Sequence, residues 1–258
     1  LGDVYKRQGQ SADMARLGAL AVRHNLAIIE DSAEAIGAAY GVRRTGSFGL
    51  GCFSFFATKN MTSGEGGMLT VPDDETAEAA VALRGHGIPS STWQRNNVDQ
   101  PWKRNAIFAG FNFRMPDILA AVGRAQLGKL DAMNAARRRH AEYLNERLPE
   151  DDLILPRERP NRTHVYQMYT VQLRSHERDR DRFVHELRSR GVGASVHFDP
   201  PVHLHDYYRR VGAPRYPLPV TEAVARRIVT LPMYPSLGEE QLDEMVAAVK
   251  GALVAAGS

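Results

Sequence analysis

One lysine of this chain stands in surroundings that favour covalent chemistry. Lys59 follows the aromatic run Phe53–Phe56, and the sequence contains only five lysines in 258 residues. An amine shielded from water is held more readily in its uncharged form, and an uncharged amine attacks carbonyl carbons. The pattern therefore indicates Schiff-base chemistry at Lys59. The alternative is a lysine that leaves a strand end and extends into solvent.

Asp31 and two hydroxyl side chains add to the chemistry that Lys59 indicates. Asp31 follows the apolar run Leu26–Ile29, and ligands of open α/β sheets bind at the carboxyl ends of strands. Asp31 is thus placed to hold a cationic ligand atom, or only to cap the following turn. Ser54 and Thr58 offer hydroxyls to an anion such as phosphate. Together these groups match the needs of pyridoxal 5'-phosphate.

A glycine-rich segment, Gly64–Gly67, comes directly after this lysine. Glycines permit positive φ angles and a close approach of the backbone to a ligand. The segment is not a P-loop, because no Lys-Ser/Thr pair follows, and it is not a dinucleotide fingerprint, because a strand pattern follows. It supports a ligand site without naming the ligand.

The elements that position these residues alternate between strands and helices, which predicts an α/β fold. Short apolar runs are typical of strands buried on both faces. A smaller second α/β domain follows a long helix, and residues 85–115 are expected to be irregular. We expect helices at 11–23, 73–84, 116–147 and 178–190, with Ser11 and Asp73 or Asp74 as caps, and strands at 26–29, 52–56, 67–71, 165–173 and 193–198.

Composition narrows the function classes. Hydrophobic residues make up 43% and charged residues 24% of the chain, and no run approaches the roughly 18 apolar residues of a membrane span. The single cysteine, Cys52, excludes a disulfide framework and favours the cytoplasm. The net charge is +3, and the Arg-rich stretches Arg137–Arg139 and Arg174–Arg190 are interpreted as solvated helix faces rather than a nucleic-acid surface.

Ordered motifs along most of the chain resemble the DegT/DnrJ/EryC1/StrS aminotransferases. The resemblance implies the fold type I of enzymes that depend on pyridoxal 5'-phosphate. It also implies transamination of a nucleotide-activated keto-sugar, with glutamate or glutamine as donor, in amino-sugar biosynthesis for a surface polysaccharide or secondary metabolite. The motifs are Glu30–Gly37, Gly46–Gly49, Phe53–Asn60, Gly64–Met68, Arg84–Gly87, Gly110–Met115, Gly191–His203 and Leu231–Pro235.

The resemblance also implies roles for single residues. Lys59 would hold the cofactor as an imine and shuttle protons, and Asp31 would pair with the pyridinium nitrogen. Ser54 would bind the phosphate, whereas Asn112 would reach the cofactor phosphate of the neighbouring subunit in an obligatory homodimer. Glu34 stands near the phenolic oxygen, where the family often has Gln or His. A carboxylate there would repel the phenolate unless one of the two is protonated.

The residue pattern predicts the domains, and the resemblance implies substrate contacts. Residues 1–8 are expected to be a non-native leader, 9–120 a partial cofactor-binding domain, and 121–258 the long helix with the small domain. His197 and His203 would contact the substrate, and so would His164 unless it fills the core. The Gly-Thr phosphate turn and the ring-stacking aromatic residue of the family have no counterpart here. We therefore expect an N-terminally truncated, inactive fragment that binds the cofactor poorly.

Two alternatives remain open on the sequence alone. His197, Asp199, His203 and His205 form a pattern that suits a metal-dependent hydrolase. The Arg-rich helices would suit a non-catalytic binding module, although that hypothesis leaves residues 31–67 unexplained.

Overall fold

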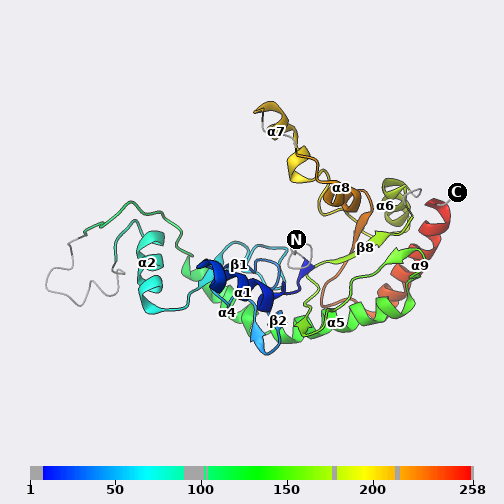
Figure 1. Cartoon of the computed structure of the whole chain (residues 1–258). Helices are drawn as coiled ribbons and strands as arrows, with labels where there is room; N and C mark the ends of the chain where they lie inside the picture. Colours follow the sequence, from blue (N-terminus) through cyan, green and yellow to red (C-terminus); the bar gives the residue numbers. More distant parts are fainter. Residues whose placement is uncertain (1–7, 90–101, 103, 176–178, 213–215, 257–258) are drawn as a thin grey trace. The chain divides into compact units, whose positions relative to one another are not determined.

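The chain divides into two compact units, which are described separately (Figure 1). The computed structural model describes residues 8–89, 102, 104–175, 179–212 and 216–256. The first unit holds Ser11–Asp131 and Asn161–Thr163, and the second holds Gln8–Gln10, Ala132–Pro160 and the chain from His164. Of the predicted leader at 1–8, only Gln8 lies within the described residues. The carbonyl oxygen of Gln8 accepts a hydrogen bond from the Met168 amide at 3.4 Å.

The central sheet of the first unit has the strand order β1-β4-β5. Strand β1 (Ile29–Asp31) runs parallel to β4 (Leu50–Ser54), which pairs antiparallel with β5 (Gly67–Thr70). In register, Asp31 lies beside Cys52, and Ser54 lies beside Gly67. The carboxyl ends of β1 and β4 therefore lie at the same edge of the sheet, as predicted for a ligand site.

The predicted burial of these strands on both faces is wrong. Ile29 of β1 is 68% exposed and Leu26 before it is 62% exposed. All four residues of β5 are exposed as well. Apolar runs predict a strand but not what covers it, and nothing among the described residues covers these side chains.

Two helices of the first unit begin at aspartate caps. Helix α1 (Met14–His24) is capped by Asp13, whose side chain accepts from the Arg16 amide at 3.2 Å, so the predicted cap at Ser11 is wrong. Helix α2 (Asp74–Arg84) begins at Asp73, which accepts from the Thr76 amide at 2.8 Å, as predicted.

The long helix predicted at 116–147 is two helices. Helix α4 (Asp117–Leu127) and helix α5 (Leu130–Arg147) are separated by Gly128 and Lys129. The Lys129 amide bonds the Gln126 carbonyl three residues back, at 2.9 Å, so the regular i to i−4 ladder is interrupted. Glycine has a low helix propensity, which explains the break at this point.

A small antiparallel sheet completes the first unit. Strand β2 (Ala39–Tyr40) lies between β3 (Arg43–Arg44) and β7 (Arg162–Thr163). Arg162 also forms an ion pair with Asp13 at 3.5 Å. The residues around 161–163 thus belong structurally to the first unit, although the sequence places them well after it.

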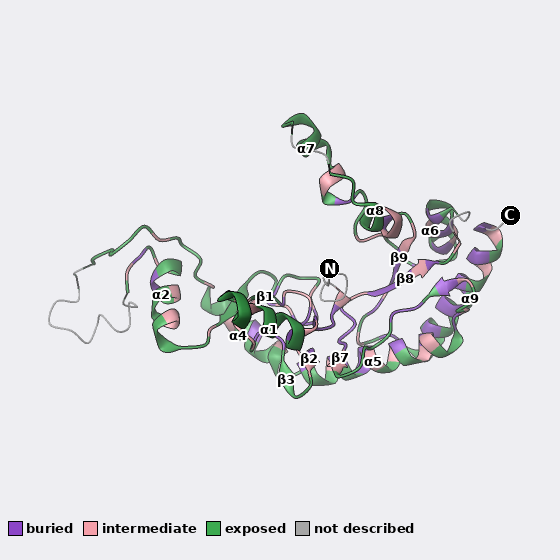
Figure 2. Cartoon of the chain, viewed as in Figure 1, coloured by how far each residue is buried: buried purple, intermediate pink, exposed green. Residues whose placement is uncertain are grey.

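The second unit is an antiparallel sheet packed against helices. Its strand order is β6-β8-β9, and α6 and α9 pack against each other. The purple of buried residues in Figure 2 runs along β8 and α9. The elements are β6 (Leu153–Ile154), β8 (Tyr169–Leu173), α6 (Arg180–Ser189), η2 (Val202–Leu204), α7 (Asp206–Arg210), α8 (Pro219–Ala225), β9 (Ile228–Leu231) and α9 (Glu239–Ala256).

Two predicted strands of this unit are shorter than expected. Only Tyr169–Leu173 of the predicted strand 165–173 is extended, since Tyr166 has a positive φ of 43°. The predicted strand 193–198 is reduced to one bridge between Ser195 and Thr230. No helix of the described chain is long and apolar enough to cross a membrane.

Candidate active site

Lys59 and Glu34 form the centre of the candidate site in the first unit. Lys59 lies in the loop between β4 and β5, and its Nζ donates to Glu34 Oε1 at 2.8 Å. Both side chains are largely enclosed, with 14% and 17% of their surface exposed. The predicted apolar surroundings of Lys59 are therefore wrong in one respect: its amine faces a carboxylate.

The loop that carries Lys59 is closed by backbone hydrogen bonds at its base. The Phe55 amide donates to the Gly66 carbonyl at 2.8 Å, and the Ser63 amide donates to the Phe55 carbonyl at 3.0 Å. Gly64 and Gly66 have positive φ angles of 87° and 142°, as predicted for this glycine-rich segment. The lysine is thus held on a defined loop rather than on a free strand end.

Glu34 lies in a turn that is anchored to the same sheet. The Ser32 amide donates to the Cys52 carbonyl of β4 at 2.8 Å, and the Ala35 amide donates to the Ser32 carbonyl at 3.0 Å. The hydroxyl of Thr45 donates to the Ala35 carbonyl at 2.7 Å. Because β4 supports both the lysine loop and this turn, the pairing of Lys59 with Glu34 follows from the fold.

Two enclosed side-chain oxygens of the turn at 32–34 have no hydrogen-bond partner within the described part of the chain. They are Oε2 of Glu34 and the hydroxyl oxygen of Ser32. Buried polar atoms are normally hydrogen-bonded, because an unmade bond costs free energy. The site therefore fits a ligand that brings polar atoms next to Lys59.

Asp31 and Ser54 lie on one face of the central sheet. Side chains alternate along a strand, and Asp31 pairs with Cys52, two residues before Ser54. One oxygen of the exposed Asp31 carboxylate accepts from the Ala33 amide at 3.1 Å, so the turn-capping contact exists. Ser54 Oγ accepts from the Phe56 amide at 3.3 Å. Both groups stand at the carboxyl ends of their strands.

Glu30 is a residue to which the sequence argument gave no role. It is fully buried, and its two carboxylate oxygens accept from the Gly46 amide at 3.0 Å and the Phe48 amide at 2.7 Å. A Cβ at Gly51 would lie 2.4 Å from Gly46, so this glycine lets the turn approach the sheet. Glu30 therefore fixes the turn at 46–48 against the face opposite Asp31. The sequence does contain a signal for Glu30, namely an acidic side chain directly after the apolar run Leu26–Ile29.

Asn112 lies on an irregular segment attached to the end of α2. Its side-chain oxygen accepts from Arg114 Nε at 3.1 Å, and its backbone forms a bridge with Gly85. The side chain of Met115 lies against Gly66, where a Cβ would meet it at 2.9 Å. The segment thus contacts the glycine-rich turn, whereas the Asn112 side chain is exposed. Its predicted reach to a partner subunit stays a prediction.

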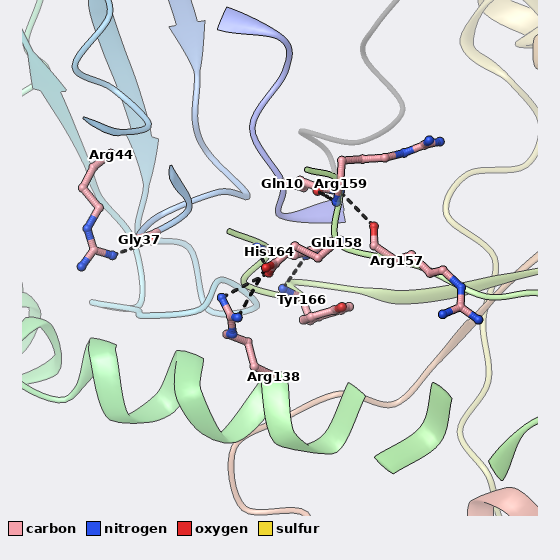
Figure 3. Close-up of polar contacts among 9 residues, drawn as sticks. All are labelled: Gln10, Gly37, Arg44, Arg138, Arg157, Glu158, Arg159, His164 and Tyr166. Atoms are coloured by element: carbon pink, nitrogen blue, oxygen red, sulfur yellow. Dashed lines mark hydrogen bonds and ion pairs between the residues drawn. The ribbon is translucent and has the colours of Figure 1, made fainter. Parts of the chain in front are cut away.

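His164 lies in the core of the second unit (Figure 3). It is 1% exposed, its Nδ1 accepts from the Tyr166 amide at 2.9 Å, and its ring stacks on the Tyr166 ring with centroids 3.9 Å apart. Burial lowers the pKa of His164 to about 3. Glu158 accepts from the His164 amide and pairs with Arg138 at 3.2 Å. His164 was expected either to contact the substrate or to fill the core, and the structure shows the core position.

The residues of the alternative metal site have separate partners. Asp199 pairs with the buried Arg180 at 2.5 Å, His203 contacts Glu222 at 3.2 Å, and His205 contacts the Pro200 carbonyl at 3.1 Å. The hydrogen bond from His203 lowers the pKa of Glu222. Within the described ranges, no three His, Cys, Asp or Glu side chains are grouped so that they could hold a metal ion. His197 contacts the Phe198 ring edge-on.

The predicted solvated face at Arg137–Arg139 is wrong for its first residue. Arg137 is 6% exposed and donates from one nitrogen to the Met233 carbonyl at 2.5 Å and to the Tyr166 carbonyl at 3.3 Å. Burial lowers the pKa of Arg137 to about 10. This guanidinium joins α5 to two other segments of the second unit and is not available to a nucleic acid.

Comparisons with known proteins agree on one family. The profile of the DegT/DnrJ/EryC1/StrS aminotransferase family matches residues 6–250. The chain is 34% identical to the spore coat polysaccharide biosynthesis protein SpsC of Bacillus subtilis over 248 residues, 94% of this chain and 64% of that protein. It is 35% identical over 247 residues to the UDP-N-acetyl-3-dehydro-alpha-D-glucosamine 3-aminotransferase of Acidithiobacillus ferrooxidans. This match covers 95% of this chain and 62% of that protein.

Solved structures give the same result. The crystal structure of DesV from S. venezuelae, determined in complex with a ketimine intermediate, is 33% identical with a TM-score of 0.82, over 95% of this chain and 63% of that one. An aminotransferase from Psychrobacter cryohalolentis is 29% identical with a TM-score of 0.86. The match covers 95% of this chain and 66% of that one. The fold is thus fold type I of the pyridoxal phosphate enzymes, as predicted. The chain spans less than two thirds of the length of its curated relatives.

Proposed function

Because the chain belongs to the DegT/DnrJ/EryC1/StrS aminotransferase family, whose cofactor is pyridoxal 5'-phosphate, we propose that it serves in a transamination. The substrate is a nucleotide-activated keto-sugar, and the amino donor is glutamate or glutamine. The product enters amino-sugar biosynthesis for a surface polysaccharide or a secondary metabolite. The names of two relatives, the polysaccharide biosynthesis protein SpsC and the UDP-linked 3-aminotransferase, support this substrate class.

The observation that carries this proposal is the enclosed amine of Lys59 on Glu34, whose second carboxylate oxygen has no hydrogen-bond partner among the described residues, near the carboxyl ends of two parallel strands. The bound cofactor supplies an electron sink for the reacting carbon. Lys59 holds the cofactor and moves protons at its Nζ. Asp31 holds the pyridinium proton, and Ser54 donates its hydroxyl to the phosphate.

Further features of the proposal concern the assembly and the substrate. A homodimer shares its sites through Asn112, which binds the cofactor phosphate of the partner subunit. His197 and His203 contact the substrate, whereas His164 is left out because it is buried in the core. The cytoplasm is the proposed compartment, on the evidence of the single cysteine.

Borohydride reduction tests the cofactor lysine. We expect a phosphopyridoxyl group on Lys59 after incubation with pyridoxal phosphate, found by mass spectrometry of the peptides. The chain is compared with a form extended to the length of its relatives, in which the yield is expected to be higher. Lys59→Ala abolishes the adduct, and Lys129→Ala, in the same unit, leaves it unchanged. An adduct on another lysine, or none in either form, contradicts the proposal.

Amino transfer tests the substrate class. The extended form is supplied with glutamate and UDP-linked 3-keto-amino sugars, and then with keto-sugars on other nucleotides. We expect amination detected as a mass change of the sugar nucleotide, with complete loss in Lys59→Ala. Glutamine in place of glutamate decides the donor. Turnover retained in Lys59→Ala would reject the assigned mechanism.

A further inference from the structure

The side chain of Met115 packs against the base of the loop that carries Lys59. A Cβ at Gly66 would lie 2.9 Å from Met115 Cε and 3.3 Å from its sulfur. Gly66 has a positive φ of 142°, and its carbonyl accepts the hydrogen bond from the Phe55 amide that closes the loop. Met115 therefore covers the backbone at the point where the lysine loop returns to the sheet.

Helix α4 meets the lysine loop at the same methionine. Gly123 of this helix is buried, and a Cβ there would lie 3.7 Å from Ser63 Cβ and 3.8 Å from Met115 Cε. Ser63 is 3% exposed and donates its amide to the Phe55 carbonyl at 3.0 Å. The Met115 methyl group thus lies beside one glycine of the loop and one glycine of the helix.

The position of Met115 also limits where Asn112 can lie. Three residues of extended chain span about 11 Å at most, and the Asn112 backbone is bridged to Gly85 at its other side. Helix α4 begins at Asp117, two residues after the methionine. A methionine fixed on the lysine loop therefore anchors the carboxyl end of the segment that presents Asn112.

We infer that Met115 is a positioning residue shared by two sites. It holds the loop of Lys59 in its own subunit, and it holds the segment from which Asn112 reaches the cofactor phosphate of the partner subunit. The second role rests on the proposed function, because the homodimer and the phosphate contact of Asn112 belong to that proposal. An unbranched methionine suits both roles, since it fills irregular gaps between backbone segments.

Hydrogen exchange tests the first role without the cofactor. In Met115→Ala, we expect the Phe55 and Ser63 amides to exchange about tenfold faster than in wild type, because the loop they close loses its cover at Gly66 and opens more often. Met115→Leu keeps the side-chain volume and should restore rates close to wild type. Mass spectrometry of the peptides measures the exchange.

Two controls separate this effect from a general loss of stability. Met14→Ala removes a methionine that is 2% exposed in the same unit, and it should leave the ratio of the Ser63 rate to the Ser32 rate unchanged. The Ser32 amide is the reference because it bonds a strand carbonyl outside the loop. Gly123→Leu should reproduce Met115→Ala, whereas Gly123→Ala, whose Cβ stands at ordinary contact distance, should not.

Mixed dimers of the extended form test the second role. A wild-type subunit is paired with a Lys59→Ala subunit, so that one cofactor lysine remains and its phosphate contact comes from Asn112 of the partner subunit. Met115→Ala is then placed in one subunit or in the other. We expect pyridoxal phosphate to dissociate about tenfold faster in both arrangements, followed by the absorbance of the bound cofactor.

The outcomes separate the two roles. Equal exchange of the Phe55 and Ser63 amides in wild type and Met115→Ala overturns the first role. Faster dissociation only when Met115→Ala lies in the subunit that supplies the lysine overturns the second. A wild-type extended form that stays monomeric or takes up no cofactor contradicts the proposed function, while the exchange rates still decide whether Met115 holds the lysine loop.

Discussion

The two units of this chain are each stabilised internally by a different kind of contact. The second unit has one continuous apolar core built from β8, β9, α5, α6 and α9, with Tyr169, Phe183 and Leu187 fully buried. In the first unit, many of the buried apolar residues are alanines, such as Ala35 and Ala38. Most of its large apolar side chains are at least partly exposed, although Met14, Phe55 and Met61 are buried. Polar contacts fix its turns, among them those of Glu30 and Thr45.

The difference in stabilising contacts coincides with the position of the candidate site. The unit that carries Lys59 and Glu34 places polar groups with directional hydrogen bonds, and two of its enclosed side-chain oxygens, on Ser32 and Glu34, have no partner within the described part of the chain. In the unit with the large core, the buried His164 and Arg137 are engaged in internal hydrogen bonds. The candidate site thus lies in the unit whose turns are fixed by polar contacts, and the larger apolar core lies in the other unit.

The largest expected effect comes from removing the same side chain in each unit. Phe183 is fully buried in the core of the second unit, whereas Phe113 in the first unit is 70% exposed and stacks on Phe111. Phe183→Ala should lower the free energy of unfolding by about 3–5 kcal/mol, because it leaves a cavity. Phe113→Ala should cost about 1 kcal/mol or less. Urea unfolding followed by circular dichroism measures both.

The pair of variants serves as its own control, since the chemical change is identical. Equal losses in the two variants would mean that the first unit buries Phe113 in solution as well. The comparison between an apolar and a polar unit would then be wrong.

The next largest effect concerns pH and the buried His164. Its pKa of about 3 in the folded chain lies below the ordinary value of 6.5, because burial disfavours the charged ring. Below pH 6.5 the unfolded chain binds a proton that the folded chain does not bind. Stability therefore falls as the pH falls from 6.5 towards 3, by about 1.4 kcal/mol per pH unit, and this contribution is constant above pH 6.5.

His164→Asn isolates this contribution. Asparagine can accept from the Tyr166 amide but does not titrate, so the free energy of unfolding should depend less on pH than in wild type, by about 2–3 kcal/mol between pH 6 and pH 4. His185→Asn, at an exposed position of the same unit, should retain the wild-type slope. Identical slopes in wild type and His164→Asn would show that His164 is open to solvent.

The sequence was sufficient for the fold class and for the order of most elements. Alternation of apolar runs and helical patterns placed β4 and β5 within two residues of their observed starts, and Asp73 was correct as a helix cap. Prediction from the sequence failed where tertiary contacts determine the end of an element or its burial. Gly128 divides a periodic pattern that looks continuous, and the cover of β1 and β5 is not encoded in their own residues.

The candidate site was predictable in its residue types but not in its contacts. The lysine, the aspartate and the glycines were visible as spacing and composition. The Lys59–Glu34 ion pair joins residues 25 positions apart, and only the pairing of β1 with β4 brings their loops together. Arg137 and His164 show the converse, because local charge patterns do not reveal that a polar side chain is enclosed.

The smallest of these effects tests whether polar contacts hold the first unit. Glu30 is fully buried and accepts from the amides of Gly46 and Phe48. Glu30→Gln keeps the shape but replaces one acceptor oxygen by a donor, which then faces a backbone N–H. We expect a loss of about 1–3 kcal/mol and faster hydrogen exchange at the Gly46 and Phe48 amides. Glu78→Gln, an exposed change of the same type, should alter neither. If Glu30→Gln is as stable as Glu78→Gln, the turn at 46–48 is held by packing. The first unit would then differ from the second in the size of its core and not in the kind of contact that maintains it.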